Sequence, residues 1–295
     1  PMSQTTRPPK PDTVYFFGTC LIDLIYPKAG VSAVQLLQRE GVKVIYPQAQ
    51  TCCGQPAWNS GYRDEARKVA RAQIKLFPKA IPIVIPSGSC AGMMKTHYPA
   101  LFKGESDEAE ALNLANRVYE LTEFLVDVLQ VNLKDLGEPV EVAVHTSCSA
   151  RREMGVADKI EQLLGQLAHV RVKEQAYKVE CCGFGGTFAI KQPEISAAMV
   201  ADKTLHIRAT GATQLISQDC GCLMNISGAF AYQAEHEGKA APTAQHIAEF
   251  LWERTQNPFP TLPLSGRGAA DGDSTPPLTR GGREGLNTSA AEAKP

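Results

Sequence analysis

The chain carries the same arrangement of cysteines twice. The first copy has a single cysteine, an adjacent pair and another single cysteine: Cys20, Cys52, Cys53 and Cys90. The second copy repeats this order at Cys148, Cys181, Cys182 and Cys220. Matching members are 128, 129 and 130 residues apart, a register that scattered cysteines would not keep, so the pattern predicts an internal duplication. Each copy draws thiols from three separate places, as a metal centre closed by folding does.

Composition restricts the classes of protein to consider. A chain of 295 residues has room for about two domains of roughly 150 residues, and 43% hydrophobic residues can fill their cores. The net charge of −1 gives no reason to expect a nucleic acid or an acidic membrane as partner. Residues 1–10 lack an apolar secretion signal, and no apolar stretch is long enough to span a bilayer. We therefore expect a cytoplasmic protein, with peripheral membrane association left open.

That expected location decides how the nine cysteines are interpreted. In a reducing cytosol they indicate metal ligation or thiol chemistry rather than disulfides. Adjacent cysteines such as Cys52 and Cys53 are also poor disulfide partners for each other, because a bridge between neighbours is strained.

The two halves meet at a predicted turn near residues 137–139, and each half alternates strands with helices. Strands are predicted at 14–17, 81–85, 140–144 and 213–216. Helices are predicted at 32–40, 65–77, 160–167 and 195–209. This alternation predicts an α/β fold of two pseudo-symmetric Rossmann-like lobes with parallel sheets. We expect a flexible arm (1–11), a first domain (12–138), a second domain (139–256) and a disordered tail rich in Gly and Pro (257–295).

Each single cysteine of the repeat comes just after the carboxyl end of a predicted strand. Ligands of parallel α/β sheets bind in the crevice beyond those ends. The candidate ligands are therefore Cys20, Cys52, Cys53 and Cys90 in the first half. In the second half they are Cys148, Cys181, Cys182, Cys220 and Cys222. Distant single ligands converging on an adjacent pair favour an iron–sulfur cluster over structural zinc, whose ligands usually form C-x(2–4)-C knuckles. A zinc scaffold and a thiol oxidoreductase remain alternatives.

Glycines near the cysteine pairs are candidate cofactor-binding residues. Gly54 and Gly183 permit the kink that adjacent ligands need, and Gly185 and Gly186 allow backbone N–H groups to approach a cluster. No catalytic residue is assigned.

Three other neighbours of the second copy have simpler explanations. His145 is expected to be a hydrogen-bonded core residue, and Asp219 to cap the following helix. Arg151 and Arg152 are expected on a solvated helix face.

Long motifs around these cysteines resemble those of the cysteine-rich CCG-domain proteins, and in particular the lactate utilisation protein A family. The matching segments are 52–62, 145–148, 181–188 and 222–228, within a resemblance covering about residues 12–253. The wider family includes the B subunit of heterodisulfide reductase and subunits of glycolate and glycerol-3-phosphate oxidation. Heterodisulfide reductase relatives end the motif in C-x-x-C and bind a noncubane cluster through five cysteines. Here Met93 replaces the last cysteine of the first copy, and Cys222 follows Cys220 one residue early, so the cluster type stays open.

The resemblance implies an iron–sulfur subunit of an L-lactate-oxidising complex that produces pyruvate. It implies [4Fe–4S] clusters, one for each CCG motif, and an oxidoreductase subunit that is not active alone. The implied partners are a ferredoxin-like iron–sulfur subunit and a third small subunit. A glycolate or glycerol-3-phosphate oxidase subunit is the alternative with the same chemistry.

Overall fold

The computed structural model describes residues 9–256 of the chain. The predicted tail (257–295), and most of the predicted arm (1–11), lie outside the described residues. Among those described, no helix is both long and apolar enough to cross a membrane.

Each half of the chain forms a four-stranded parallel sheet. The strands of the first half are β1 (Thr13–Phe16), β2 (Lys43–Ile45), β3 (Ile83–Ile85) and β4 (Val118–Glu120). They lie in the order β2-β1-β3-β4. The strands of the second half are β5 (Val140–His145), β6 (Val170–Val172), β7 (Gln214–Ser217) and β8 (Thr243–His246). Their order, β6-β5-β7-β8, is the same, so the predicted α/β fold of two duplicated lobes is confirmed.

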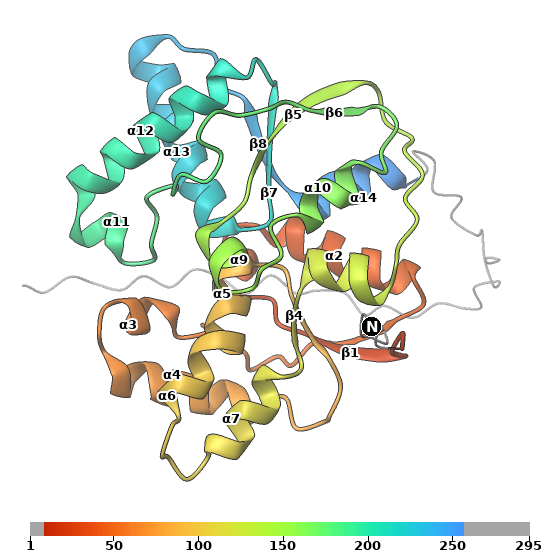
Figure 1. Ribbon diagram of the computed structural model, residues 1–295, viewed down its shortest axis with the longest axis vertical. Coiled ribbons are helices and arrows are strands. Elements are labelled where there is room, and N and C mark those ends of the chain that lie inside the picture. Colours follow the sequence, from red (N-terminus) through yellow and green to blue (C-terminus); the bar gives the residue numbers. More distant parts are fainter. Residues whose placement is uncertain (1–8, 257–295) are drawn as a thin grey trace, which may run out of the picture. The chain divides into compact units, whose positions relative to one another are not determined.

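Helices connect these strands (Figure 1). Those of the first half are α1 (Cys20–Leu24), α2 (Pro27–Arg39), α3 (Gln55–Asn59), α4 (Arg63–Ile74), α5 (Gly88–Gly92), α6 (Tyr98–Leu101), α7 (Glu108–Ala115) and α8 (Leu121–Glu123). Two π-helical segments, η1 (Met93–His97) and η2 (Phe124–Val128), continue α5 and α8. Those of the second half are α9 (Cys148–Arg152), α10 (Lys159–Leu164), α11 (Phe188–Lys191), α12 (Pro193–Ala209), α13 (Cys220–Glu237) and α14 (Ile247–Thr255).

The two lobes share a hydrophobic core. One cluster of buried side chains draws on both halves, with Leu36 and Leu37 from α2, Leu163 from α10, and Ile247 and Leu251 from α14. Figure 1 shows α2 and α14 close together between the sheets. Two smaller clusters fill the outer part of each lobe. Burial of aliphatic side chains at about 25 cal/mol per Å² therefore stabilises the contact between the lobes as well as each lobe.

The strand order places a crevice at an equivalent point in each sheet. From β1 the chain passes to β2 on one side and later returns to β3 on the other, and β5, β6 and β7 repeat this path. Ligands of such sheets bind at this reversal, beyond the carboxyl ends of the two central strands. The helices that begin there, α1 and α5 in one lobe and α9 and α13 in the other, contain the single cysteines.

Candidate metal centres

The four cysteines of the first copy converge beyond β1 and β3. The Cys52 sulfur lies close enough to interact with the thiols of Cys20 and Cys53, and Cys53 interacts in turn with Cys90. Cys53 is buried, whereas the other three are partly accessible. The structure thus brings together every thiol predicted for the first half.

Interactions within this set separate the pKa values of its thiols. The Cys20 thiol, followed by Cys53, lowers the pKa of Cys52 to about 3. The Cys52 thiol in turn raises the pKa of both Cys20 and Cys53, and burial adds to the increase. Negative charge is therefore centred on the Cys52 sulfur, and the thiols of Cys20 and Cys53 stabilise it there. A bound cation would take the place of the shared protons, because metal binding to thiols releases them.

A glycine with left-handed backbone follows each cysteine pair. The φ angle is 90° at Gly54 and 82° at Gly183. In both copies the glycine N–H points to the sulfur of the first cysteine of the pair, at 3.4 Å. A Cβ on Gly183 would lie 2.7 Å from the carbonyl oxygen of Ser196, so a side chain is excluded by space as well as by φ. Gly185 and Gly186 also have positive φ, of 51° and 68°.

The second copy forms an equivalent set of four thiols. Cys148 interacts with Cys181, Cys181 with Cys182, and Cys182 with Cys222. The neighbouring Cys182 thiol lowers the pKa of Cys222, but burial and the nearby negative charges of Asp219, Cys148 and Cys181 together raise it to about 11. Cys222 therefore completes the second set.

The second cysteine of each pair is held by its backbone carbonyl. Tyr98, just after η1, donates its hydroxyl to the carbonyl of Cys53 at 2.9 Å. In the second lobe Asn225 of α13 donates its amide to the carbonyl of Cys182 at 2.7 Å. Each pair is thus fixed by a side chain from the segment that follows the last cysteine of its copy.

Cys220 lies apart from the second set, although it is the counterpart of Cys90 in the repeat. Burial raises its pKa, and the nearby negative charges of Asp219 and Cys90 raise it further. Its titrating neighbours thus include a thiol of the first set and none of the second.

Asp219 caps α13 as predicted and also links the lobes. Its Oδ1 accepts hydrogen bonds from the backbone N–H groups of Gly221 at 3.1 Å and Cys222 at 3.4 Å. Its Oδ2 accepts from the backbone N–H of Ser89 in α5 at 2.8 Å. One carboxylate therefore positions helices that carry ligands of both sets.

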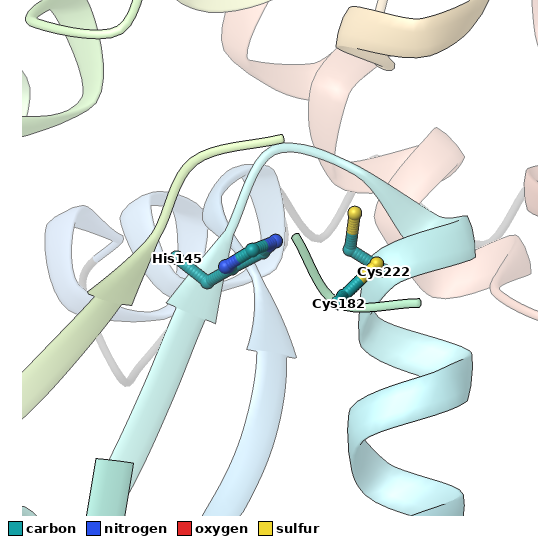
Figure 2. A group of neighbouring side chains, drawn as sticks. All are labelled: His145, Cys182 and Cys222. Carbon is teal, nitrogen blue, oxygen red and sulfur yellow. The ribbon is translucent and has the colours of Figure 1, made fainter. Parts of the chain in front are cut away.

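The prediction of a hydrogen-bonded core role for His145 is wrong in one respect. The residue ends β5 and is buried, with 1% of its surface exposed, but neither ring nitrogen has a hydrogen-bond partner. A ring nitrogen of His145 and the sulfurs of Cys182 and Cys222 all lie within 4.8 Å of one another. Figure 2 shows the imidazole directed toward these two cysteines. The donors match those that bind zinc or iron.

Two basic side chains near the second set were not identified correctly from the sequence. Arg152 is exposed as predicted, but Arg151 is partly buried and donates to the carbonyl of Thr146 at 2.7 Å. Lys203 in α12 is fully buried and donates to the carbonyl of Lys178 at 3.1 Å. Burial lowers the pKa of Lys203 to about 8, against the opposing influence of acidic neighbours that include Cys182. The sequence could have indicated this burial, because Lys203 comes three residues after the apolar Val200 and therefore lies on the same, inward face of α12.

A family model matches both lobes. The model for the cysteine-rich domain named CCG matches residues 14–95 and 142–227. These two matches contain all nine cysteines and correspond to the two lobes.

Curated relatives resemble most of the chain. Lactate utilization protein A of Oceanobacillus iheyensis is 46% identical over 241 residues, covering 81% of this chain and 96% of the relative. Lactate utilization protein A 2 of Bacillus cereus strain AH820 is 45% identical over 240 residues, covering 81% and 97%.

A solved structure supports the fold alone. A hypothetical protein from Helicobacter pylori superimposes with a TM-score of 0.60 at 11% identity. The match covers 85% of this chain and 51% of the other, so the chain spans about half the length of that protein.

Proposed function

Because the chain belongs to the cysteine-rich CCG-domain family and, within it, to the lactate utilization A proteins, we propose that it is the iron–sulfur electron-transfer subunit of a complex that oxidises L-lactate to pyruvate. The observation that carries the proposal is the convergence of four thiols at the same point of each lobe. One [4Fe–4S] cluster would be held by Cys20, Cys52, Cys53 and Cys90. The other would be held by Cys148, Cys181, Cys182 and Cys222.

The chemistry of the donor sets supports iron–sulfur clusters. Four thiolates are the usual complement of a [4Fe–4S] cluster. Backbone N–H groups of Gly54 and Gly183 point to cysteine sulfurs, and such hydrogen bonds tune the reduction potential of bound clusters. Such clusters supply reversible one-electron transfer. The chain's own residues turn the cysteine pairs, bury the second cysteine of each pair and hold their loops in place.

The interface between the lobes supports a role in electron transfer between two centres. Ser60 lies near the first motif and Thr187 near the second, and their hydroxyls form a hydrogen bond at 2.6 Å. Gly88 of α5 and Ala150 of α9 are so close that a Cβ on the glycine would lie 2.8 Å from the alanine Cβ. Each of these two helices contains a ligand cysteine, so the two sets are joined through packed protein.

The partners of the proposed complex are a ferredoxin-like iron–sulfur subunit and a third small subunit, with electrons passing onward through the former. No residue of this chain is assigned to the oxidation of lactate itself. The names of the relatives favour lactate over glycolate or glycerol-3-phosphate as the substrate of the complex.

Metal analysis of anaerobically purified protein tests the iron–sulfur assignment. We expect iron and acid-labile sulfide, and broad absorbance near roughly 400 nm that bleaches on reduction. Cys52→Ser and Cys181→Ser should each lose iron from one centre. Cys220→Ser is the matched control and should retain both, because Cys220 belongs to neither set. Colourless protein with stoichiometric zinc would refute the proposal.

Growth tests the physiological part of the proposal. A strain lacking the gene should fail to grow on L-lactate and recover when the wild-type gene is restored. It should grow normally on glycolate and on glycerol 3-phosphate. Normal growth on lactate, with a defect on either other substrate, would reassign the complex.

A further inference from the structure

His145 is a buried polar side chain whose hydrogen-bonding capacity is unused. It is 1% exposed, and both Nδ1 and Nε2 lack partners. Buried polar groups in folded proteins are nearly always hydrogen-bonded, so such a group requires an explanation. Gln218 follows Ser217, the register partner of His145, and both of its amide atoms are also buried without partners. This edge of the second sheet is therefore polar and unsatisfied.

The position of the imidazole explains the missing partners. Its nitrogen and the sulfurs of Cys182 and Cys222 lie within 4.8 Å of one another, so the imidazole faces the space that these two thiols share (Figure 2). A metal centre bound there would meet the imidazole as a third donor, and the bond to the metal would satisfy the ring nitrogen.

The first lobe provides an internal comparison. His145 precedes Cys148 by three residues, and the residue three before Cys20 is Phe17. Phenylalanine offers no donor atom, and Phe17 is packed in the core of its lobe. The two copies therefore differ at this position: the second has a nitrogen donor beside its thiols, and the first has none.

We propose that the imidazole of His145 is a nitrogen ligand of the second centre, a fifth protein donor beside its four thiols, so that the two centres differ in ligation. The first would be bound by sulfur alone, and the second by sulfur and nitrogen. This inference rests on the proposed function, since it requires metal centres in both lobes.

The two lobes also differ in the charged side chains near their thiols. A Cβ on the motif glycine would face Met199 in the second lobe and Val69 in the first. Four residues further along each helix lie Lys203 and Gln73, both buried. A buried cationic lysine near the second set thus corresponds to a neutral amide near the first.

Arg151 shows the same contrast. It comes three residues after Cys148, whereas Asp23 comes three residues after Cys20. Positive charge and histidine ligation both raise the reduction potential of an iron–sulfur centre. The carboxylate of Asp219 acts on Cys148 and Cys222 and opposes this effect, but it is one negative charge against two positive ones and a histidine ligand. We therefore expect the second centre to be the more easily reduced and a single added electron to reside there.

Pulsed EPR on reduced protein with 15N-labelled histidine tests the nitrogen ligand directly. We expect one strongly coupled histidine nitrogen in the wild type and its loss in His145→Phe, which installs the residue of the first copy. His236→Phe is the matched control and should retain the coupling, because His236 lies on α13, fourteen residues and about 21 Å beyond Cys222.

Potentiometric titration tests the consequence for the potentials. In the wild type the centre coupled to histidine should be reduced first. Its midpoint should fall in His145→Phe, whereas that of the other centre should stay unchanged. Lys203→Gln should lower the same midpoint but retain the nitrogen coupling, which separates the ligand from the charge.

The outcomes distinguish failure of the His145 inference from failure of the proposed function. Wild-type protein with two iron–sulfur centres but no strongly coupled histidine nitrogen would overturn this inference and leave the proposed function intact. Coupling that persists in His145→Phe would overturn it as well. Protein without iron–sulfur centres would overturn the proposed function itself. The labelled wild type gives an answer even if His145→Phe fails to fold.

Discussion

Gly88, at the start of α5, should not tolerate even a methyl group. An added Cβ would lie 2.8 Å from the Cβ of Ala150 and 2.8 Å from the Oγ of Ser147, across the contact between the lobes. The alanine methyl has no torsion that would move it away. The Ser147 hydroxyl could rotate, but it caps α9 by accepting from the backbone N–H of Ala150 at 3.1 Å. Gly88→Ala must therefore either push the helices apart or break a helix cap.

The size of the effect follows from two opposing contributions. Overpacking of a filled site costs about 1–3 kcal/mol. Replacing glycine reduces the entropy of the unfolded chain and restores about 0.4–1 kcal/mol. From the middle of each range, the net loss in the free energy of unfolding is about 1.3 kcal/mol. For a chain of this size it lowers Tm by about 3–5 °C.

Gly228→Ala is the matched control for this prediction. Gly228 also lies in a helix, α13, but a Cβ there would meet no atom within 4 Å. Only the entropic gain applies, so Tm should rise by about 1–4 °C. Circular dichroism melts of both variants, at one scan rate and equal metal content, give the comparison. A Gly88→Ala protein as stable as the wild type would refute the argument from close packing.

Three further substitutions test the capping, burial and ion pairing of named groups. Asp219→Ala removes the α13 cap and the hydrogen bond from Ser89. It should lower the free energy of unfolding in urea by about 1–3 kcal/mol, and Asp219→Asn should lower it less. Equal losses in the two variants would contradict the capping role. Burial raises the pKa of Glu120 to about 8, so the folded state keeps a proton that the unfolded state releases near pH 4.5, and stability falls as pH rises through this interval. Glu120→Gln removes that fall, so its Tm relative to wild type should increase from pH 6 to pH 8.5, and a constant difference would count against it. Arg254→Ala leaves the fully buried Asp135 carboxylate without the guanidinium 2.8 Å away and should cost about 3–5 kcal/mol; a change in Tm below 2 °C would show that solvent replaces the pair.

The central strands and the helices α2, α4, α10 and α12 were predictable because their hydrophobic patterns are local. β1, β3, β5 and β7 are largely buried, apolar and directly followed by cysteines, and all four appear where expected. The remaining strands were missed. β2 and β6 are three residues long and partly exposed at sheet edges, so their sequences show no run that differs from a loop. Pairing with a neighbour, rather than local preference, makes them strands.

The thiol sets were predictable except at the C-x-C segment. Cys220 and Cys222 were both candidates for the second centre, because sequence proximity suggests proximity in space. Both residues lie in the first turn of α13, where positions two apart point about 200° away from each other. Only one of them can face the second set. The other is directed toward the neighbourhood of Cys90, a placement that depends on the contact between lobes.

That contact also explains why the first site depends on the second half of the chain. The β3–α5 connection that leads to Cys90 is held from the other lobe at two points. His246 accepts from the backbone N–H of Ala248 through Nδ1 and donates through Nε2 to the carbonyl of Pro86 at 3.1 Å, and Asp219 accepts from Ser89. Glu120 caps the helix after the fourth strand of the first lobe as His246 does in the second, yet its Oε1 has no partner. Through His246 the second lobe positions a ligand of the first, and the first lobe has no equivalent bond from Glu120, so the two copies have become different parts of one unit.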